Sequence, residues 1–330
     1  MTGRYPIPLW KVVLDGRDLT ERIAPRLLEL TLTESRGDEA DQLDLRISDH
    51  DGALALPKRG VSLTLAMGWV DSGMVNKGTF VVDDVEHSGA PDVITVRARS
   101  ADLTGAIRSR RERSWHDTTL GAVLSTIAGD HSLKSAIAPA LSGLAVPHLD
   151  QANESDINLL TRLAKRFDAV ATVKAGTLVF APIGSGTTPS GIALPGAQIT
   201  RQSGDQHRYA VSDREKYTGV RAYWGNRGDA RRTGVLVGTA DNEKKLQATY
   251  ATEAEARQHA QADFQRLDRG TASLSYTLAL GRADLYPEQS ITVSGFKPEI
   301  DGTDWLVSKA THTISGSAGF TTSLELERGG

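Results

Sequence analysis

The same order of short features occurs near both ends of this 330-residue chain. Near the N-terminus, an alternating run at 43–47 precedes a Leu-Pro pair, a second alternating run at 61–65, a Gly-Trp pair and two further alternating segments. Near the C-terminus, the run at 274–278 precedes Leu-Tyr-Pro, a second alternating run at 291–293, Gly-Phe and again two alternating segments. Alternation of apolar and polar residues is typical of a strand with one buried face. The repeated order therefore predicts two β domains built on one plan.

Turn residues separate these alternating runs. Asp-Gly pairs occur at 15–16 and 51–52, and Pro- and Gly-containing segments occur at 57–60 and 89–92. Such residues favour the backbone angles that tight turns require. Five or more short strands joined in this way favour a sandwich or a barrel. The fold class that we predict is mainly β, with an α+β insertion between two β-barrel or sandwich domains.

The most specific stretch lies at 148–167, near the middle of the chain. Asn153 and Ser155 can each accept a hydrogen bond from a free backbone N–H at a helix start, and Glu154 and Asp156 place negative charge where the helix dipole favours it. The apolar stripe that follows consists of Ile157, Leu160, Leu163, Ala164 and Phe167. This spacing predicts an amphipathic helix. Helices of this kind are core elements in many folds, so the helix alone assigns no activity.

Two further helices are predicted on either side of this stretch. One begins at Asp117 or Thr118 and stops at Gly129, and the other begins with the capping box of Thr252 and Glu255. A segment rich in Gly, Ser, Thr and Pro at 184–191 is typical of a linker. We therefore expect a β domain at 1–105, a small α+β domain at 106–183, a linker at 184–210 and a second β domain at 211–330.

Composition excludes several classes of protein. The chain has no cysteine, so disulfides, thiolate metal sites and cysteine nucleophiles are ruled out. The net charge of −3 gives no overall basic excess for binding nucleic acid or anionic lipid. No signal peptide and no run of roughly 18 apolar residues is present, so we expect assembly in a cytoplasm and no membrane anchor.

The sequence offers few candidates for chemistry. The segment 48–52 lacks most ligands of a calcium loop, and the zinc-protease and serine-hydrolase motifs are absent. We therefore expect no catalytic, cofactor-binding or metal site. The run 108–113 contains four arginines beside Trp115 and is the best nucleic-acid candidate. A solvated face or a patch of salt bridges between subunits is the favoured interpretation of this run.

The central stretch carries a resemblance to a known family. Gln151, Asn153, Glu154, Ser155 and Asp156, followed by Leu160-x-Arg162-Leu163-Ala164, resemble the central motif of the phage late control D proteins. The spike proteins of type VI secretion carry a similar sequence. Other family-like features occur in the same order, at 14–16, 41–45, 56–60, 68–69, 78–80, 100–102, 114–120, 281–287, 295–296 and 300–305. The resemblance covers nearly the whole chain, and it is weakest at 184–215.

The resemblance implies a baseplate hub protein of a contractile tail, with no enzymatic activity. Such proteins form a homotrimeric ring between a sixfold tail tube and a threefold central spike, and each subunit carries two domains similar to the tube protein. The implied partners are the spike protein, the tube or tube-initiator protein and, less directly, a tape-measure protein, with DNA only passing through the lumen. The implied location is the baseplate of a virion or tail-like particle. The motif Gln151–Asp156 with Arg162 is then a structural bracket or a subunit contact. A peptidoglycan-degrading tail hydrolase is the alternative.

Overall fold

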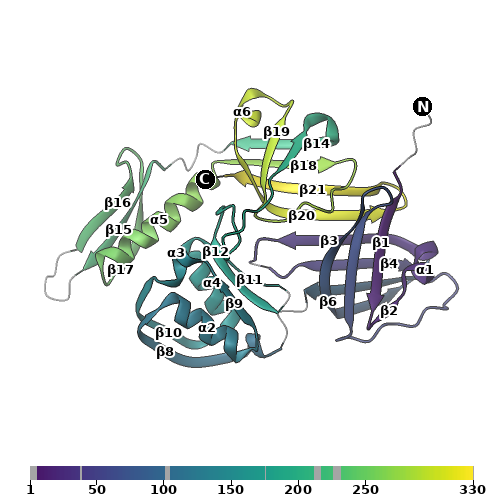
Figure 1. Cartoon of the computed structure of the whole chain (residues 1–330), viewed down its shortest axis with the longest axis horizontal. Helices are drawn as coiled ribbons and strands as arrows, with labels where there is room; N and C mark the ends of the chain where they lie inside the picture. Colours follow the sequence, from purple (N-terminus) through teal and green to yellow (C-terminus); the bar gives the residue numbers. More distant parts are fainter. Residues whose placement is uncertain are drawn as a thin grey trace.

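The computed structural model describes residues 6–37, 39–100, 105–174, 176–211, 217–225 and 232–329, which form four units (Figure 1). The first β unit contains β1 (Pro8–Leu14), β2 (Arg17–Asp18), α1 (Thr20–Ile23), η1 (Ala24–Arg26), β3 (Leu27–Ser35), β4 (Gln42–Ser48), β5 (Ser62–Trp69), β6 (Gly73–Ser88) and β7 (Val93–Ser100). The second β unit contains β13 (Ala197–Thr200), η4 (Arg201–Ser203), β14 (Gly204–Val211), β18 (Ala272–Leu278), β19 (Ser290–Ser294), α6 (Pro298–Asp301), β20 (Trp305–Ser315) and β21 (Gly319–Arg328).

The other two units combine helices with small sheets. The middle unit contains η3 (Gly105–Arg108), β8 (Arg110–Thr119), α2 (Leu120–Asp130), β9 (Lys134–Ile137), α3 (Pro139–Ser142), β10 (Ala145–Ser155), α4 (Asp156–Phe167), β11 (Ala169–Lys174) and β12 (Thr177–Pro182). The lateral unit contains β15 (Gly219–Gly225), β16 (Arg232–Gly238), β17 (Glu243–Tyr250) and α5 (Glu253–Arg269). None of the helices in the described part of the chain is long and apolar enough to cross a lipid bilayer.

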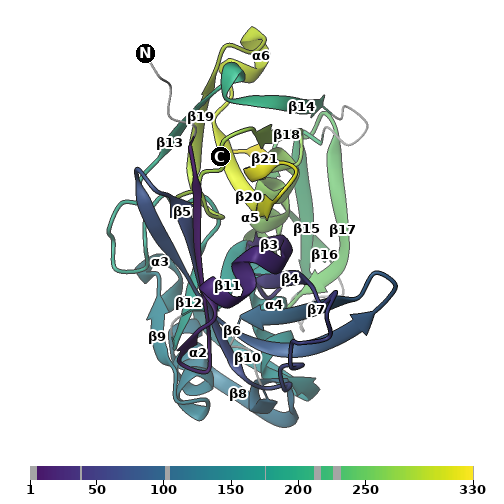
Figure 2. The same cartoon turned by 90° about the vertical axis from the view of Figure 1, so that its right-hand side faces the viewer.

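The two β units share one sheet. Its strands follow the order β14-β18-β21-β20-β3-β4-β7-β6-β5-β1-β2, and β19 with β13 branches off β20. Figures 1 and 2 show the ladder from β14 down to β4 in two views. The units join where β3 pairs antiparallel with β20, over seven residue pairs from Lys309↔Ser35 to Ser315↔Glu29. The junction is therefore an ordinary β ladder between segments almost 300 residues apart in sequence.

The two β units repeat one pairing order. The first unit runs β3-β4-β7-β6-β5, and the second runs β14-β18-β21-β20-β19, with every neighbouring pair antiparallel. The β-bulges also lie at corresponding positions in the two units. One interrupts β3 between Leu27 and Glu29 and β14 between Gly204 and Gln206. The other interrupts β6 between Val82 and Asp84 and β20 between Val307 and Lys309. The duplicated plan predicted from sequence is therefore present in the strand pairing.

Each β unit curls its sheet around an apolar core. In the first unit, inward residues of β1, β5, β3 and β4 pack together, and Ile314 and Phe320 of the second unit complete this core. The core of the second unit contains Trp305, Tyr276 and Leu324. Among the described residues neither ladder closes, because β3 pairs with β20 rather than with β1 or β2, and β14 at the end of the second ladder pairs only with β18. The prediction of a mainly β fold with an α+β insertion is confirmed, and the β units are open, sandwich-like sheets.

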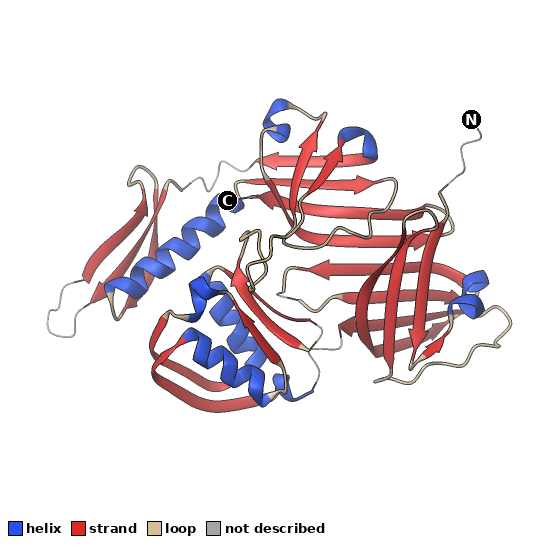
Figure 3. Ribbon diagram, viewed as in Figure 1, coloured by secondary structure: helices blue, strands red, loops and turns tan. Residues whose placement is uncertain are grey.

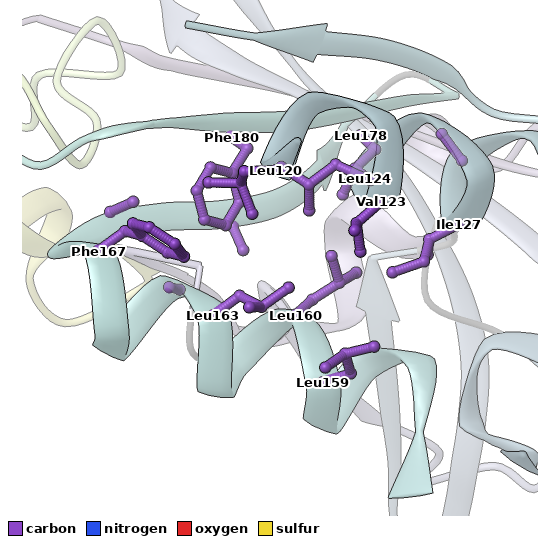
Figure 4. Packing of buried hydrophobic residues seen from close by; sticks show 14 of the residues in the cluster. Leu120, Val123, Leu124, Ile127, Leu159, Leu160, Leu163, Phe167, Leu178 and Phe180 are labelled. Carbon is purple, nitrogen blue, oxygen red and sulfur yellow. The ribbon is translucent and has the colours of Figure 1, made fainter. Parts of the chain in front are cut away.

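The middle unit packs α2 and α4 between two small sheets (Figure 4). Leu120, Val123, Leu124 and Ile127 of α2 face Leu160 and Leu163 of α4, and Phe180 of β12 fills the space between the helices and the sheet. These side chains are at most 1% exposed, and burying each contributes roughly 1.5–3 kcal/mol. The predicted stripe of α4 is correct, except that Ile157 is only partly buried and Leu159, which was not predicted, is fully buried.

The structure divides the last third differently from the sequence prediction. The expected linker at 184–210 contains β13 and most of β14, which pair with β19 and β18. The expected second β domain at 211–330 contains the lateral unit, a separate three-stranded sheet with α5 along one face (Figure 3). Ala256 and Ala260 lie on the apolar face of α5 and pack on Val220, Ala222 and Val235 of this sheet. The helix therefore buries its apolar face within the lateral unit. The predicted boundary at 105–106 adjoins residues 101–104, which lie outside the described residues.

Helix starts agree with the sequence only in part. Thr252 caps α5 as predicted, since its side chain accepts a hydrogen bond from the N–H of Glu255. The cap of α2 is Thr119 rather than Asp117 or Thr118, because β8 continues through those two residues. Ser155 caps α4, whereas Asn153 lies within β10 with a φ of 50°. The polar segment before α4 is thus the end of a strand.

Candidate functional site

The central motif forms a buried bracket around Asp156. This carboxylate is fully buried at the first position of α4. Gln151 donates its side-chain amide to Asp156 over 2.8 Å, and His131 Nε2 lies 2.7 Å from the other carboxylate oxygen. Arg113 donates to the same carboxylate, and Arg111 Nε lies 3.3 Å from it. We call these five residues the Asp156 bracket. The bracket connects the C-terminal end of β10 with β8, with the end of α2 and with the start of α4.

The geometry keeps Asp156 ionised. Burial acts to raise the pKa of the Asp156 carboxyl. The hydrogen bonds from Gln151 and His131 and the charges of Arg113 and Arg111 outweigh burial and hold the pKa below its ordinary value. A group of this kind stabilises the fold above its unfolded-state pKa, and the contribution is lost as the pH falls through the folded-state pKa.

The basic run 108–113 supplies two arms of this bracket. Arg113 and Arg111 point from β8 to Asp156 and also bind Asp130 at the end of α2, over 2.5 and 2.9 Å. The Arg113 guanidinium also lies 4.9 Å from the centre of the Trp115 ring. Two of the four arginines therefore neutralise carboxylates of their own unit, so the run is a poor candidate for holding a phosphate backbone.

Three further motif residues, Asn153, Glu154 and Arg162, lie at the surface of the same corner. Arg162 binds Glu154 through two hydrogen bonds of 3.2 and 2.7 Å and also donates to the backbone oxygen of Asp150. Asn153 is exposed and occupies the bulge of β10, where a positive φ favours Asn. The six motif residues thus divide into a buried part, Gln151, Ser155 and Asp156, and an outer part, Asn153, Glu154 and Arg162.

Sequence reasoning missed the partners that make the bracket. Arg111, Arg113 and His131 lie outside the motif, and their pairing depends on the register of β8 against β10, in which Gln151 lies opposite Arg113. A signal was present in β8, where Arg111, Arg113 and Trp115 alternate with exposed residues. This alternation predicts three side chains on one face of a strand.

A second cluster lies at the junction of the two β units. Glu34 of β3 binds Lys77 of β6 over 2.6 Å and His312 of β20 over 3.2 Å, and all three side chains are at most 8% exposed. The Glu34 carboxylate can only accept, so the ring proton lies on Nε2, and burial lowers the pKa of His312 so that Nδ1 carries none. Nδ1 therefore accepts the Thr322 hydroxyl over 2.9 Å, and the Thr322 oxygen in turn accepts the N–H of Arg282. His312 is then a neutral imidazole that donates Nε2–H to Glu34. We call Glu34, Lys77 and His312 the junction triad.

Five alternating charges connect all four units. Asp168, which follows α4, binds Arg269 of α5 through hydrogen bonds of 2.6 and 2.5 Å, and Arg269 Nε lies 3.0 Å from Glu327 of β21. Glu327 also binds Arg36, just after β3, and Arg36 binds Glu288. No side chain of this ion-pair chain is more than 23% exposed. The chain of ion pairs therefore fixes the middle and lateral units against the shared sheet.

Replacing Arg269 with Ala is expected to loosen this arrangement. The change leaves Asp168 and Glu327 without their shared cation, which for a buried pair costs on the order of 3 kcal/mol. Hydrogen exchange at the C-terminal turns of α4 and α5 should accelerate at least 10-fold. Arg257→Ala is the matched control, because Arg257 pairs with Glu253 on the exposed face of the same helix. Equal exchange in the two variants would show that the ion-pair chain contributes no stability.

Comparisons with known proteins agree with this architecture. The family model described as phage tail baseplate hub (GPD) matches residues 22–318. The chain is similar to the probable baseplate hub proteins of Escherichia phages P2 and 186. It is 45% identical to each, and each alignment covers 98% of this chain and 94% of the relative.

Solved structures share the fold at low sequence identity. The tail protein from Neisseria meningitidis MC58 matches with a TM-score of 0.72 and 14% identity, covering 97% of this chain and 96% of that one. The 43 kDa tail protein of prophage MuSo2 from Shewanella oneidensis matches with a TM-score of 0.69 and 16% identity over 97% and 98%. An E. coli component of the type VI secretion system matches with a TM-score of 0.57 and 15% identity over 98% and 75%. The family match, the two relatives and the shared fold together show that the chain belongs to the phage tail baseplate hub (GPD) family.

Proposed function

We propose that three copies of this hub protein form a ring that joins a sixfold tail tube to a threefold central spike. The repeat of pairing order and bulge positions in the two β units supports this proposal. Three chains present six related β units, so one face of the ring matches a sixfold partner while the ring keeps threefold symmetry. A ring with one type of heterologous contact closes only if each unit's surface complements the next.

The partners follow from the position of such a ring. The tube or tube-initiator protein would contact the six β units, and the spike would contact the opposite face. A tape-measure protein and DNA would pass through the lumen. The baseplate of a tail is the location that the family membership gives, and assembly in the host cytoplasm is part of the proposal.

The Asp156 bracket has a structural role in this proposal. The bracket fixes α4 to β8 and β10, and the outer motif residues, Asn153, Glu154 and Arg162, are available at the surface of the middle unit for contact with a neighbouring subunit. Sedimentation at micromolar concentration tests the ring itself. We expect a species of three times the 35.4 kDa chain mass. A chain that stays monomeric at every concentration would contradict the proposal.

A peptidoglycan hydrolase is the second candidate function, and one observation favours it. Asp41 lines a groove of about 900 Å³ between three units, together with Asp284 and Tyr286. Burial raises the pKa of the Asp41 carboxyl, as is common for a general acid. Against this, Asp41 lies 3.2 Å from Lys174 and accepts the N–H of Ser35. The hub family is also a structural family. A zymogram on cell-wall substrate should show no clearing. Clearing that disappears in Asp41→Asn would favour the hydrolase.

A further inference from the structure

The strands β14 and β6 of the shared sheet each have an open edge in the described part of the chain. Among the described residues, β14 pairs only with β18, so its other edge carries unpaired backbone groups. The long strand β6 pairs with β5 only up to Val81, whereas its pairing with β7 continues to Ser88. Residues 83–88 of β6 therefore also have an open edge. Exposed edges of this length are templates for pairing with another chain.

Each strand with an open edge has a counterpart at the same place in the other β unit. Leu32 of β3 lies opposite Leu43, and Tyr209 of β14 lies opposite Leu274, which occupies the same place in the second unit as Leu43 in the first. The strand β14 is thus the counterpart of β3. By the same alignment, in which the bulges coincide, β6 is the counterpart of β20, and His87 takes the place of His312.

The counterparts are paired with each other at the junction. There, β20 and β3 join the two units with Ala310 opposite Glu34, His312 opposite Leu32 and Thr313 opposite Thr31. Transferring this register to the open edges gives four pairs that lie within β6 and the described part of β14, Val85 with Val211, Glu86 with Ala210, His87 with Tyr209, and Ser88 with Arg208.

The side chains at these positions suit such a pairing. Val211 is 56% exposed although it points to the same side of β14 as Tyr209, which packs on the core of the second unit. Val85 packs at the edge of the core of the first unit. Placed opposite each other, the two valines would cover one another. Glu86 and Arg208 would lie diagonally across the ladder on the other face, within reach of an ion pair.

We propose that β14 of one copy of this chain pairs antiparallel with residues 85–88 of β6 in the next copy, in the register that joins β3 to β20. This inference rests on the proposed trimeric ring and names the surface that closes it. Each contact uses one β14 edge and one β6 edge, so three copies leave neither edge open. Every junction around the ring, within or between chains, then has the same ladder.

Engineered cysteines test the register, because the native chain contains none. Residues directly opposite in an antiparallel pair have Cα atoms roughly 4.5–5.5 Å apart, a separation that permits a disulfide. We expect the double variant Val85→Cys, Val211→Cys to give a covalent trimer on a non-reducing gel after mild oxidation. The control Glu86→Cys, Val211→Cys shifts the register by one residue and places the thiols on opposite faces. It should cross-link at least 10-fold less.

The proposed ion pair between Glu86 and Arg208 gives an independent test of the strand pairing. Arg208→Glu should weaken trimer formation several-fold, and Glu86→Arg in the same chain should restore it. A trimer that sediments normally but cross-links neither cysteine pair, or cross-links the shifted pair better, would overturn the strand pairing and leave the proposed function standing. The absence of any trimer would overturn both. A covalent trimer from the first pair alone, together with rescue by the charge swap, would support the inference.

Discussion

Asp156→Ala is expected to unfold the middle unit under conditions that leave the shared sheet folded. The change removes the carboxylate that compensates Arg113, Arg111 and His131, and none of these three side chains is more than 33% exposed. Removing one partner of a buried pair costs roughly 3–5 kcal/mol. That is a large share of the typical 5–15 kcal/mol stability of a domain. Hydrogen exchange in α2 and α4 should therefore become fast while β3 and β20 stay protected.

The matched control for Asp156→Ala is Glu154→Ala, two residues earlier. Glu154 pairs with Arg162, whose side chain is 46% exposed, and exposed ion pairs contribute about 0–1 kcal/mol. This variant should fold normally, and any defect that it has should appear only in ring assembly. If Asp156→Ala exchanged no faster than Glu154→Ala, the Asp156 bracket would not hold the unit together.

Glu34→Ala should separate the two β units at their common ladder. The change leaves the Lys77 ammonium, only 4% exposed, without its anion and removes the acceptor of His312. A loss on the order of 3 kcal/mol is expected, with faster exchange along β3 and β20. Arg97→Ala is the control, because its partners Asp84 and Glu86 lie on the exposed face of the neighbouring strand β6. Similar exchange in both variants would contradict a stabilising role for the junction triad.

Acid should weaken the same junction in the unchanged protein. Burial acts to raise the pKa of Glu34, but the His312 hydrogen bond and the Lys77 charge lower it to about 2, from an ordinary value of 4.5. The contribution of Glu34 is thus complete above pH 4.5 and is lost as the pH falls toward 2. Burial also lowers the pKa of His312 below its ordinary value of 6.5, so its contribution declines from that pH downward. Both groups make the junction less stable in acid, and exchange measured against pH checks this sign.

The sequence predicts the repeated β plan because strand alternation and turn residues are local signals. The runs at 43–47 and 274–278 prove to be β4 and β18, which occupy the same place in the two units. The sequence does not reveal that β3 pairs with β20, since this contact joins segments almost 300 residues apart. The lateral unit was missed for a similar reason, because β15 alternates like any strand of the main sheet. Only the location of its partners, β16 and β17, places it in a separate sheet.

The candidate sites could also be predicted only in part, because some of their residues are distant in sequence. The motif at 151–156 identifies Gln151 and Asp156 but not Arg113 or His131, which reach them through a strand register and a helix end. No local sequence pattern predicts the junction triad, because Glu34, Lys77 and His312 come from three distant strands. The caps Ser155 and Thr252 were predicted correctly, since each acts on an N–H group three residues later in the same segment. The predicted caps Asn153 and Asp117 or Thr118 were wrong, because strands continue through them.

A reconstruction of the assembled baseplate by electron cryo-microscopy tests the central claim most directly. We expect a ring of three chains in which first and second β units alternate around six roughly equivalent positions, with β14 of one chain beside β6 of the next. A ring of six chains, or a trimer in which one β unit lies outside the ring, would contradict it.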